Sequence, residues 1–129
     1  MEGSADTAPR TWRLDLTRHA VDGVFVLEVA GRLGTGSSGE LIEALVQATV
    51  DGHRRILCDL GAVDYVSSAG LLALDAASGR IGLDGGELVL CNLTDPVRLV
   101  LDLSGLLPHF AVADSRDAGL AVLRKTATP

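Results

Sequence analysis

Apolar and polar residues alternate over 12–17 at the start of the chain. This period of two predicts a strand with one buried face. The pair Asp22-Gly23 is favoured in tight hairpin turns, and the apolar run 24–29 after it predicts a second strand beside the first. Glycines then recur over 31–36, which predicts a flexible connection.

The middle of the chain combines a helical period with one continuous apolar run. Ser37 and Glu40 have the spacing of a capping box, and the apolar stripe after them predicts a helix that ends near Gly52. The run 56–60 predicts a buried strand. The apolar and alanine-rich stretch that follows predicts a second helix, which closes at Gly79 or Gly82.

The last third of the chain repeats this alternation. Residues 87–91 predict a fourth strand, and Thr94-Asp95-Pro96 predicts a helix start with a capping residue and a proline at the first position. Ser104-Gly105 ends that helix, and residues 109–112 predict a short fifth strand. Asp114 or Ser115 caps a last helix.

This order of elements predicts an α/β fold. An N-terminal hairpin leads into a mixed, mostly parallel sheet of four to five strands with about four helices, because strand–helix alternation implies right-handed crossovers. A chain of 129 residues fits one domain. We place the domain at 11–125, with a flexible tail over 1–10 and a frayed end over 126–129.

Charge and composition narrow the function. The formal net charge of −6 argues against nucleic acid as a partner. The sequence has no apolar run near the ~20 residues that span a bilayer and no signal-peptide pattern, so we expect no membrane insertion. Cys58 and Cys91 lie in apolar runs and are interpreted as buried hydrophobic residues. We therefore expect a cytoplasmic protein.

The patterns of common catalytic and cofactor sites are missing. The Gly-x-Ser-x-Gly motif of serine hydrolases fails, because Tyr65 and Val66 stand where its first glycine would precede Ser67 or Ser68. The three histidines, one expected at the hairpin turn and two at strand starts, suggest no catalytic triad. Neither a phosphate-binding Gly-x-x-x-x-Gly-Lys motif nor a metal-ligand cluster is present. We expect no enzyme, no cofactor and no metal.

Ser67 and Ser68 stand between the buried strand 56–60 and the following helix. One hydroxyl could cap the helix while the other stands exposed at its N-terminus, where the helix dipole favours an anion such as a phosphate. Functional residues of open α/β sheets lie beyond the carboxyl ends of the strands, as these do. A plain helix cap is the alternative interpretation.

Four stretches together resemble the STAS domain family, and within it the bacterial anti-sigma factor antagonists. Gly31-Arg32-Leu33 is similar to the Gly-Glu-Leu after the family's second strand, and Ile56-Leu57-Cys58-Asp59-Leu60 to its hydrophobic-Asp-Leu strand. The corner from Val63 to Leu71 is similar to the family's Val-x-Phe/Tyr-Met/Ile-Asp-Ser-Ser/Thr-Gly-Leu. The stretch from Val97 to Leu106 is similar to its late helix.

The resemblance implies a phosphorylated serine at Ser68, with Ser67 as the less favoured acceptor. It also implies two partners: an anti-sigma factor serine kinase of the histidine-kinase-like ATPase type, bound by the unphosphorylated protein, and a PP2C-type phosphatase that resets the switch. The chain departs from the family pattern at two positions, because Ser67 replaces the usual Asp and Ala69 replaces Ser or Thr. These departures put the rate and the target of phosphorylation in question.

The loop 32–38 is expected beside this corner, because neighbouring parallel strands end on one side of a sheet; a mere connector is the other interpretation. The predicted partner-binding residues are Arg32, Leu33, Thr35, Ser37, Tyr65, Val66, Ser67, Ser68, Ala69, Gly70 and Leu71. Within the same fold, the alternative function is a regulatory subunit of a membrane transporter or a signalling scaffold. A nucleotide-binding domain is a third hypothesis, and self-association is left open.

Overall fold

The structure, a computed structural model, describes residues 14–127. Its elements are β1 (Leu14–Val21), β2 (Val24–Leu33), α2 (Ser38–Val50), β3 (Arg55–Val66), α3 (Ser68–Leu83), β4 (Glu87–Cys91), α4 (Asp95–Leu103), the 3-10 turn η2 (Leu107–His109), β5 (Ala111–Ala113) and α5 (Arg116–Ala127). The predictions for residues 1–10, for 12–13 of the first strand and for 128–129 lie outside this range. α5 continues two residues past the domain limit predicted at 125.

The strands form one sheet in the order β1-β2-β3-β4-β5. β1 and β2 are antiparallel and end with Val21 opposite Val24, whereas the other neighbours are parallel. Asp22 and Gly23 form the turn with φ of 52° and 81°, the left-handed values that a two-residue hairpin turn needs. The predicted α/β fold, with a hairpin leading into a mostly parallel sheet, is confirmed.

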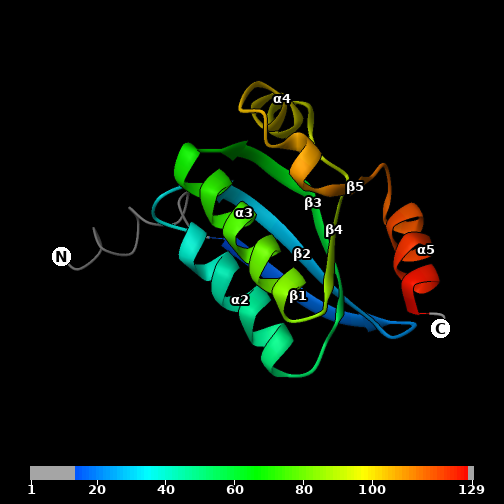
Figure 1. The fold of residues 1–129 in the computed structure, drawn as a ribbon. Helices are drawn as coiled ribbons and strands as arrows, with labels where there is room; N and C mark the ends of the chain where they lie inside the picture. Colours follow the sequence, from blue (N-terminus) through cyan, green and yellow to red (C-terminus); the bar gives the residue numbers. More distant parts are fainter. Residues whose placement is uncertain (1–13, 128–129) are drawn as a thin grey trace.

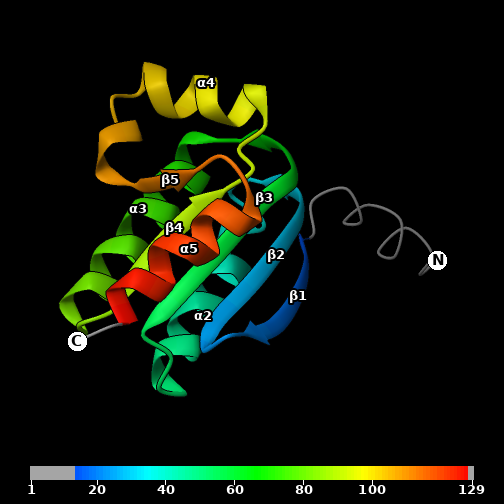
Figure 2. The ribbon, with the colours of Figure 1, turned by 90° about the vertical axis from the view of Figure 1, so that its right-hand side faces the viewer.

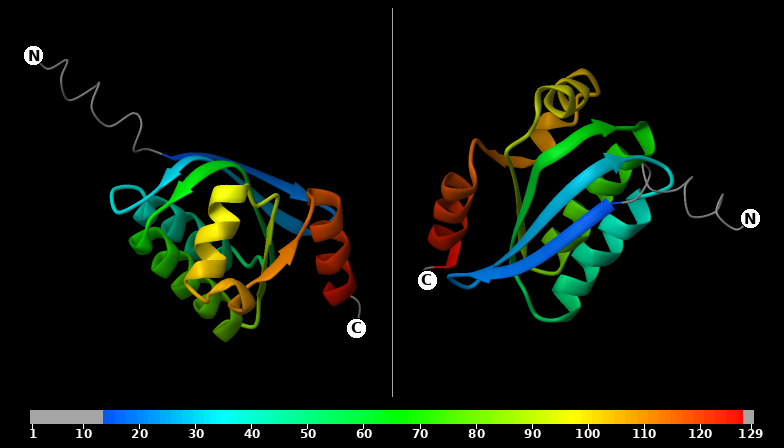
Figure 3. Two further views of the ribbon diagram at one scale, coloured as in Figure 1. Left: turned by 90° about the horizontal axis from the view of Figure 1, so that it is seen from above. Right: turned by 180° about the vertical axis from the view of Figure 1, so that it is seen from behind.

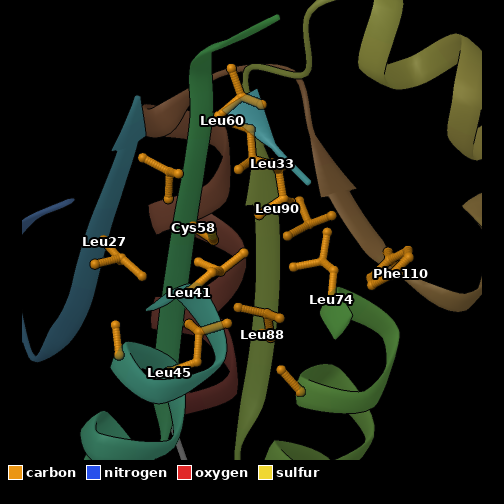
Figure 4. Close-up of a cluster of buried hydrophobic side chains, with 14 of the residues drawn as sticks. Leu27, Leu33, Leu41, Leu45, Cys58, Leu60, Leu74, Leu88, Leu90 and Phe110 are labelled. Atoms are coloured by element: carbon orange, nitrogen blue, oxygen red, sulfur yellow. The ribbon is translucent and has the colours of Figure 1, made fainter. Parts of the chain in front are cut away.

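Helices cover the two faces of the sheet unequally. α2 and α3 lie side by side on one face, and α5 lies on the other (Figures 1 and 2). Seen from behind, α5 covers only part of its face: it packs on Val24 and Val26 of β2 and leaves most of β1 uncovered (Figure 3). Most buried side chains, including Leu27, Leu45 and Leu74, fill the layer under α2 and α3 (Figure 4). Burying each contributes about 1.5–3 kcal/mol, so this layer anchors the loops at the ends of the strands.

Two strands extend further than their apolar patterns predict, β2 to Leu33 and β3 to Val66. Irregularities between Glu28 and Ala30 and between Gly31 and Arg32 let the two strands stay paired to their ends, where Leu33 lies opposite Val66. Bulges of this kind depend on the neighbouring strand and are not visible in one strand's alternation. The predicted flexible connection over 31–36 is therefore wrong in its first half, which is strand.

Three further predictions are displaced. The fifth strand is Ala111–Ala113 instead of 109–112, because the chain makes a 3-10 turn over Leu107–His109 first. His19 lies within β1, not at the hairpin turn. α3 passes both of its predicted terminal glycines and ends at Leu83.

Of two predicted helix caps, the one at α4 is wrong and the one at α5 is confirmed. The hydroxyl of Thr94, the residue before α4, does not cap that helix and donates instead to the Val63 carbonyl at 2.7 Å. This bond ties the start of α4 to the far end of β3. At α5, Ser115 rather than Asp114 caps the helix, because its Oγ accepts from the Ala118 N–H at 3.1 Å.

Candidate functional site

The corner between β3 and α3 divides its two serines between two roles. Ser67 precedes the helix in an extended conformation, and its Oγ accepts a hydrogen bond from the Gly70 N–H at 3.1 Å. Ser67 is therefore the N-cap, which satisfies one of the free N–H groups of the first turn. Ser68 is the first residue of the helix and is exposed. Its hydroxyl stands at the positive end of the helix dipole.

The end of β2 holds this corner in place. The Ser67 N–H donates to the Leu33 carbonyl at 2.9 Å. Gly70 lies against the same carbonyl so closely that a Cβ at this position would be 2.6 Å from the Leu33 oxygen. Only glycine fits there without displacing backbone. The predicted close backbone approach at Gly70 is thus observed, and it fixes the helix start against β2.

The loop between β2 and α2 is built around Ser37, which is 1% exposed. Its Oγ donates to the Arg32 carbonyl at 2.6 Å and accepts from the Gly34 N–H at 3.0 Å. The predicted capping box is wrong, because this hydroxyl makes no cap bond and the Glu40 carboxylate accepts instead from the Leu14 N–H at 3.2 Å. The loop is a hydrogen-bonded turn and not a free connector.

The structure brings the loop and the corner together. The Arg32 guanidinium carbon lies 4.5 Å from the centroid of the Tyr65 ring, a cation–π contact across the ends of β2 and β3. Gly34 lies under Ser67 and Tyr65, because a Cβ at Gly34 would be 3.7 Å from both side chains. The expected juxtaposition of loop and corner is therefore observed.

The eleven predicted partner-binding residues fall into an exposed group and a buried group. Six of them reach solvent fully or partly: Arg32, Thr35, Tyr65, Ser67, Ser68 and Ala69. The other five are buried: Leu33, Ser37, Val66, Gly70 and Leu71. The buried side chains shape this surface from below, whereas the six exposed or partly exposed residues form the surface itself.

Sequence reasoning missed an apolar groove beside Ser68. It runs between α3 and α4, and its lining residues are Ser68, Leu71, Leu72, Val100, Ser104 and Leu106. Leu72 is 65% exposed, although it follows the buried Leu71 directly. The sequence indicates only that one of these two leucines is less buried, because consecutive residues of a helix point about 100° apart. Which of the two is exposed depends on where α4 packs.

A polar network lies on the sheet face that α5 partly covers. Arg116 of α5 bridges Glu28 of β2 and Asp59 of β3, and its Nη2 lies 2.9 Å from Asp59 Oδ2. Hydrogen bonds from Arg116 and His19 hold the pKa of Glu28 below its usual value. Burial raises the pKa of Asp59, but hydrogen bonds from the Gly61 N–H, Arg116 and Asn92 outweigh it and the net shift is downward. The network fastens α5 to the sheet.

Within the described residues, the histidine and cysteine side chains take part in ion pairs, ring contacts or core packing. His19 pairs with Glu28 and His109 with Asp75, whereas His53 stacks on Phe25. Cys58 and Cys91 are free and buried, and burial raises the pKa of both thiols, for Cys91 to about 12. In residues 14–127, no group of three His, Cys, Asp or Glu side chains could hold a metal ion. None of the helices described there has the length and apolar character needed to cross a membrane.

Comparison with known proteins assigns this chain to a family. The family model described as STAS domain matches residues 16–119. The anti-sigma factor antagonist BtrV of Bordetella bronchiseptica, so named provisionally, is 41% identical over 117 residues, which cover 90% of this chain and 99% of that protein. The anti-sigma-F factor antagonist RsfB of Mycobacterium tuberculosis is 32% identical over 59% of this chain and 61% of its own length.

A solved structure agrees in fold. The crystal structure of an anti-sigma factor antagonist from Mycobacterium paratuberculosis matches with a TM-score of 0.77 and 25% identity, over 86% of this chain and 94% of that one. The sheet order, the helices and the sequence similarity thus lead to the same assignment. The chain belongs to the STAS domain family, in the group whose members are named anti-sigma factor antagonists.

Proposed function

We propose that this protein is a phosphorylation-controlled anti-sigma factor antagonist. In its unphosphorylated form it binds an anti-sigma factor serine kinase of the histidine-kinase-like ATPase type and so frees a sigma factor. The kinase phosphorylates Ser68, the complex dissociates, and a PP2C-type phosphatase restores the binding form. The protein acts by binding and catalyses no reaction itself.

The observation that carries this proposal is the division of roles between the two serines. Ser67 is engaged as the helix cap, whereas the adjacent Ser68 is exposed and is not needed for that cap. A kinase can reach the Ser68 hydroxyl without breaking the helix start. Phosphorylation of Ser67 would instead remove the acceptor that Gly70 uses, so Ser68 is the favoured acceptor.

Electrostatics explains how such a phosphate could act as a switch. It adds roughly −1.5 to −2 charges, and the first turn of α3 contains no acidic residue that would oppose it. The helix dipole favours the anion, so we expect the domain to stay folded. In a partner interface the same charge must be desolvated, and opposing like charge costs several kcal/mol. The phosphate therefore changes binding and not folding.

The surface proposed for the kinase combines a polar part with an apolar part. Arg32 and Tyr65 contact each other at the ends of β2 and β3, and Ser68 itself lines the groove with Leu72 and Val100. The buried core of such an interface is more apolar than its rim and contains few charges, and like charges placed opposite each other cost several kcal/mol. Ser68 stands at the boundary of the two parts, where a charge has the greatest effect.

The two departures from the family pattern concern the kinase more than the fold. Ser67 caps α3 as an Asp would, because both residue types accept from a backbone N–H. An Asp at position 67 would also place a carboxylate beside the acceptor, which Ser67 does not. We propose that the kinase phosphorylates Ser68 without the help of that carboxylate. Ala69 is only partly exposed and removes a second hydroxyl from the corner.

The test is a binding titration against a histidine-kinase-like ATPase encoded near this chain. Replacing Ser68 with Glu should weaken binding by about 3 kcal/mol, or about 150-fold. The matched control, Ser68→Gln, has the same size without the charge and should lose far less. Equal affinity for wild type and Ser68→Glu would refute the switch, and the regulatory transporter subunit or scaffold would then be the better hypothesis.

A further inference from the structure

α4 presents an apolar face to solvent that its own domain does not cover. The helix buries Val97 and Leu101 against the core. Leu99 and Leu103 are 55% and 78% exposed. At about 100° per residue, the two exposed leucines are one turn apart and lie on the side away from the buried pair. α4 stands at one end of the molecule, apart from α2 and α5 (Figure 1), so this face is accessible.

Opposite charges border this face on one side. Arg98 and Asp102 are both exposed and lie one turn apart on the same flank of α4. Neither takes part in a salt bridge in the portion of the chain that the structure describes. Asp95, the remaining charge of the helix, lies in the first turn, where the dipole favours it. The other flank, with Val100 and Ser104, is uncharged and faces the groove beside Leu72.

The exposed leucines of α4 and the Arg98/Asp102 charges beside them form a surface that is complementary to a second copy of itself. When two identical helices pack antiparallel about a two-fold axis, the same flank of each meets across the contact with its order reversed. Arg98 of one copy then lies beside Asp102 of the other, and the pair is formed twice. The leucines of each helix pack between those of the other. A parallel arrangement would instead place this charged flank against the uncharged flank of the other copy, so neither ion pair would form.

From this self-complementarity we infer that a second copy of the chain is the partner that α4 binds, through an antiparallel contact centred on Leu99 and Leu103. The net charge of −6 works against indiscriminate association, so the two ion pairs supply the specificity. The contact is small, since only one short helix of nine residues contributes most of it. We therefore expect a weak, concentration-dependent dimer.

Two single charge reversals test the contact when they are measured alone and mixed. In a dimer of Arg98→Asp, the new aspartate of each copy lies beside Asp102 of the other. In a dimer of Asp102→Arg, the new arginine of each copy lies beside Arg98 of the other. Each variant alone should lose at least about tenfold in self-affinity by sedimentation velocity. An equimolar mixture should recover the wild-type affinity, because every Asp at position 98 then faces an Arg at position 102.

Matched leucine variants separate this face from exposed apolar surface in general. Leu103→Glu should leave the protein monomeric, whereas Leu83→Glu should not change the dimer, although Leu83 is 87% exposed at the far end of α3. Circular dichroism verifies that all variants are folded. The inference is overturned if wild type stays monomeric up to about 1 mM, or if the mixed charge variants associate no better than each alone.

Discussion

At the scale of single residues, the corner between β3 and α3 depends on Gly70, which has no side chain, and on the orientation of the Ser67 hydroxyl. Gly70 lets α3 start against the Leu33 carbonyl, and Ser67 turns its hydroxyl back onto the helix. These two residues fix the backbone on which Ser68 stands. The Ser68 side chain takes no part in the hydrogen bonds that hold the corner, so it can be modified while the corner stays formed.

Adding one methyl group at Gly70 should destabilise the protein. In Gly70→Ala the new Cβ would lie 2.6 Å from backbone oxygen, so the free energy of unfolding should fall by about 1–3 kcal/mol. Gly79 is the control within the same helix, because a Cβ added there would meet no atom within 4 Å. Gly79→Ala should raise the stability by about 0.5–1 kcal/mol. Urea denaturation of both variants checks the opposite signs.

At the scale of elements, Ser37 decides the shape of the loop between β2 and α2. Replacing it with Ala removes a buried hydroxyl that both donates and accepts. The Gly34 N–H and the Arg32 carbonyl would lose their partner, at a cost of about 1–3 kcal/mol. We expect Ser37→Ala to lower the midpoint of urea unfolding accordingly.

The exposed Thr35 in the same loop gives the matched comparison. Thr35→Ala should change stability by no more than about 0.5 kcal/mol, because a surface substitution leaves no buried group unpaired. If Ser37→Ala is as stable as Thr35→Ala, the loop is not held by that hydroxyl, and the support described beneath the partner surface is wrong.

Most elements could be predicted from the sequence because their signals are local. The hairpin turn, the buried strands β3 and β4 and the serine cap of α3 each follow from a few neighbouring residues. The extensions of β2 and β3 depend on irregular pairing between two strands, and no single run of residues encodes it. Phe110 fits a strand pattern because it is apolar, yet it is buried just before β5 begins.

In the candidate site, too, the features that depend on contacts between elements could not be predicted from the sequence. Placing the loop beside the corner requires only the parallel order of β2 and β3, so the sequence is enough. Knowing which leucine of α3 is exposed requires the position of α4, and therefore the sequence does not reveal the groove with Leu72. Ser37 has the spacing of a cap, but the tight turn after β2 offers its hydroxyl two nearer partners.

At the scale of the whole molecule, Arg116 connects α5 to two strands and makes stability depend on pH. The pKa values of Glu28 and Asp59 lie below their usual range in the folded state, so the unfolded chain binds protons more readily. The resulting stabilisation is complete above the usual carboxyl pKa of about 4 and is lost as pH falls through the folded-state values. Acid should therefore loosen this network first.

Replacing Arg116 with Gln should flatten that dependence. We expect Arg116→Gln to be less stable than wild type at neutral pH and closer to it in acid, as measured by urea unfolding across pH. Arg124→Gln is the control on the same helix, because Arg124 pairs with the well-exposed Asp22 at 3.1 Å. It should keep the wild-type pH dependence, since exposed pairs contribute little. Parallel profiles for wild type and Arg116→Gln would contradict this role of Arg116.

The two proposed surfaces meet at Leu72 and Val100, which line the groove beside the acceptor and border the exposed face of α4. If both contacts form as proposed, a kinase bound over Ser68 and a second copy bound on α4 compete for space. Adding the kinase should then shift the protein from dimer to complex. This expectation depends on both proposals and tests neither alone.

The most direct test of the central claim is to incubate the protein with the histidine-kinase-like ATPase and ATP, then measure intact mass and map the modified residue. We predict one added phosphate on Ser68, absent in Ser68→Ala and retained in Ser67→Ala. A phosphate on Ser67, or an unmodified protein that still binds the kinase, would contradict the proposed switch at Ser68.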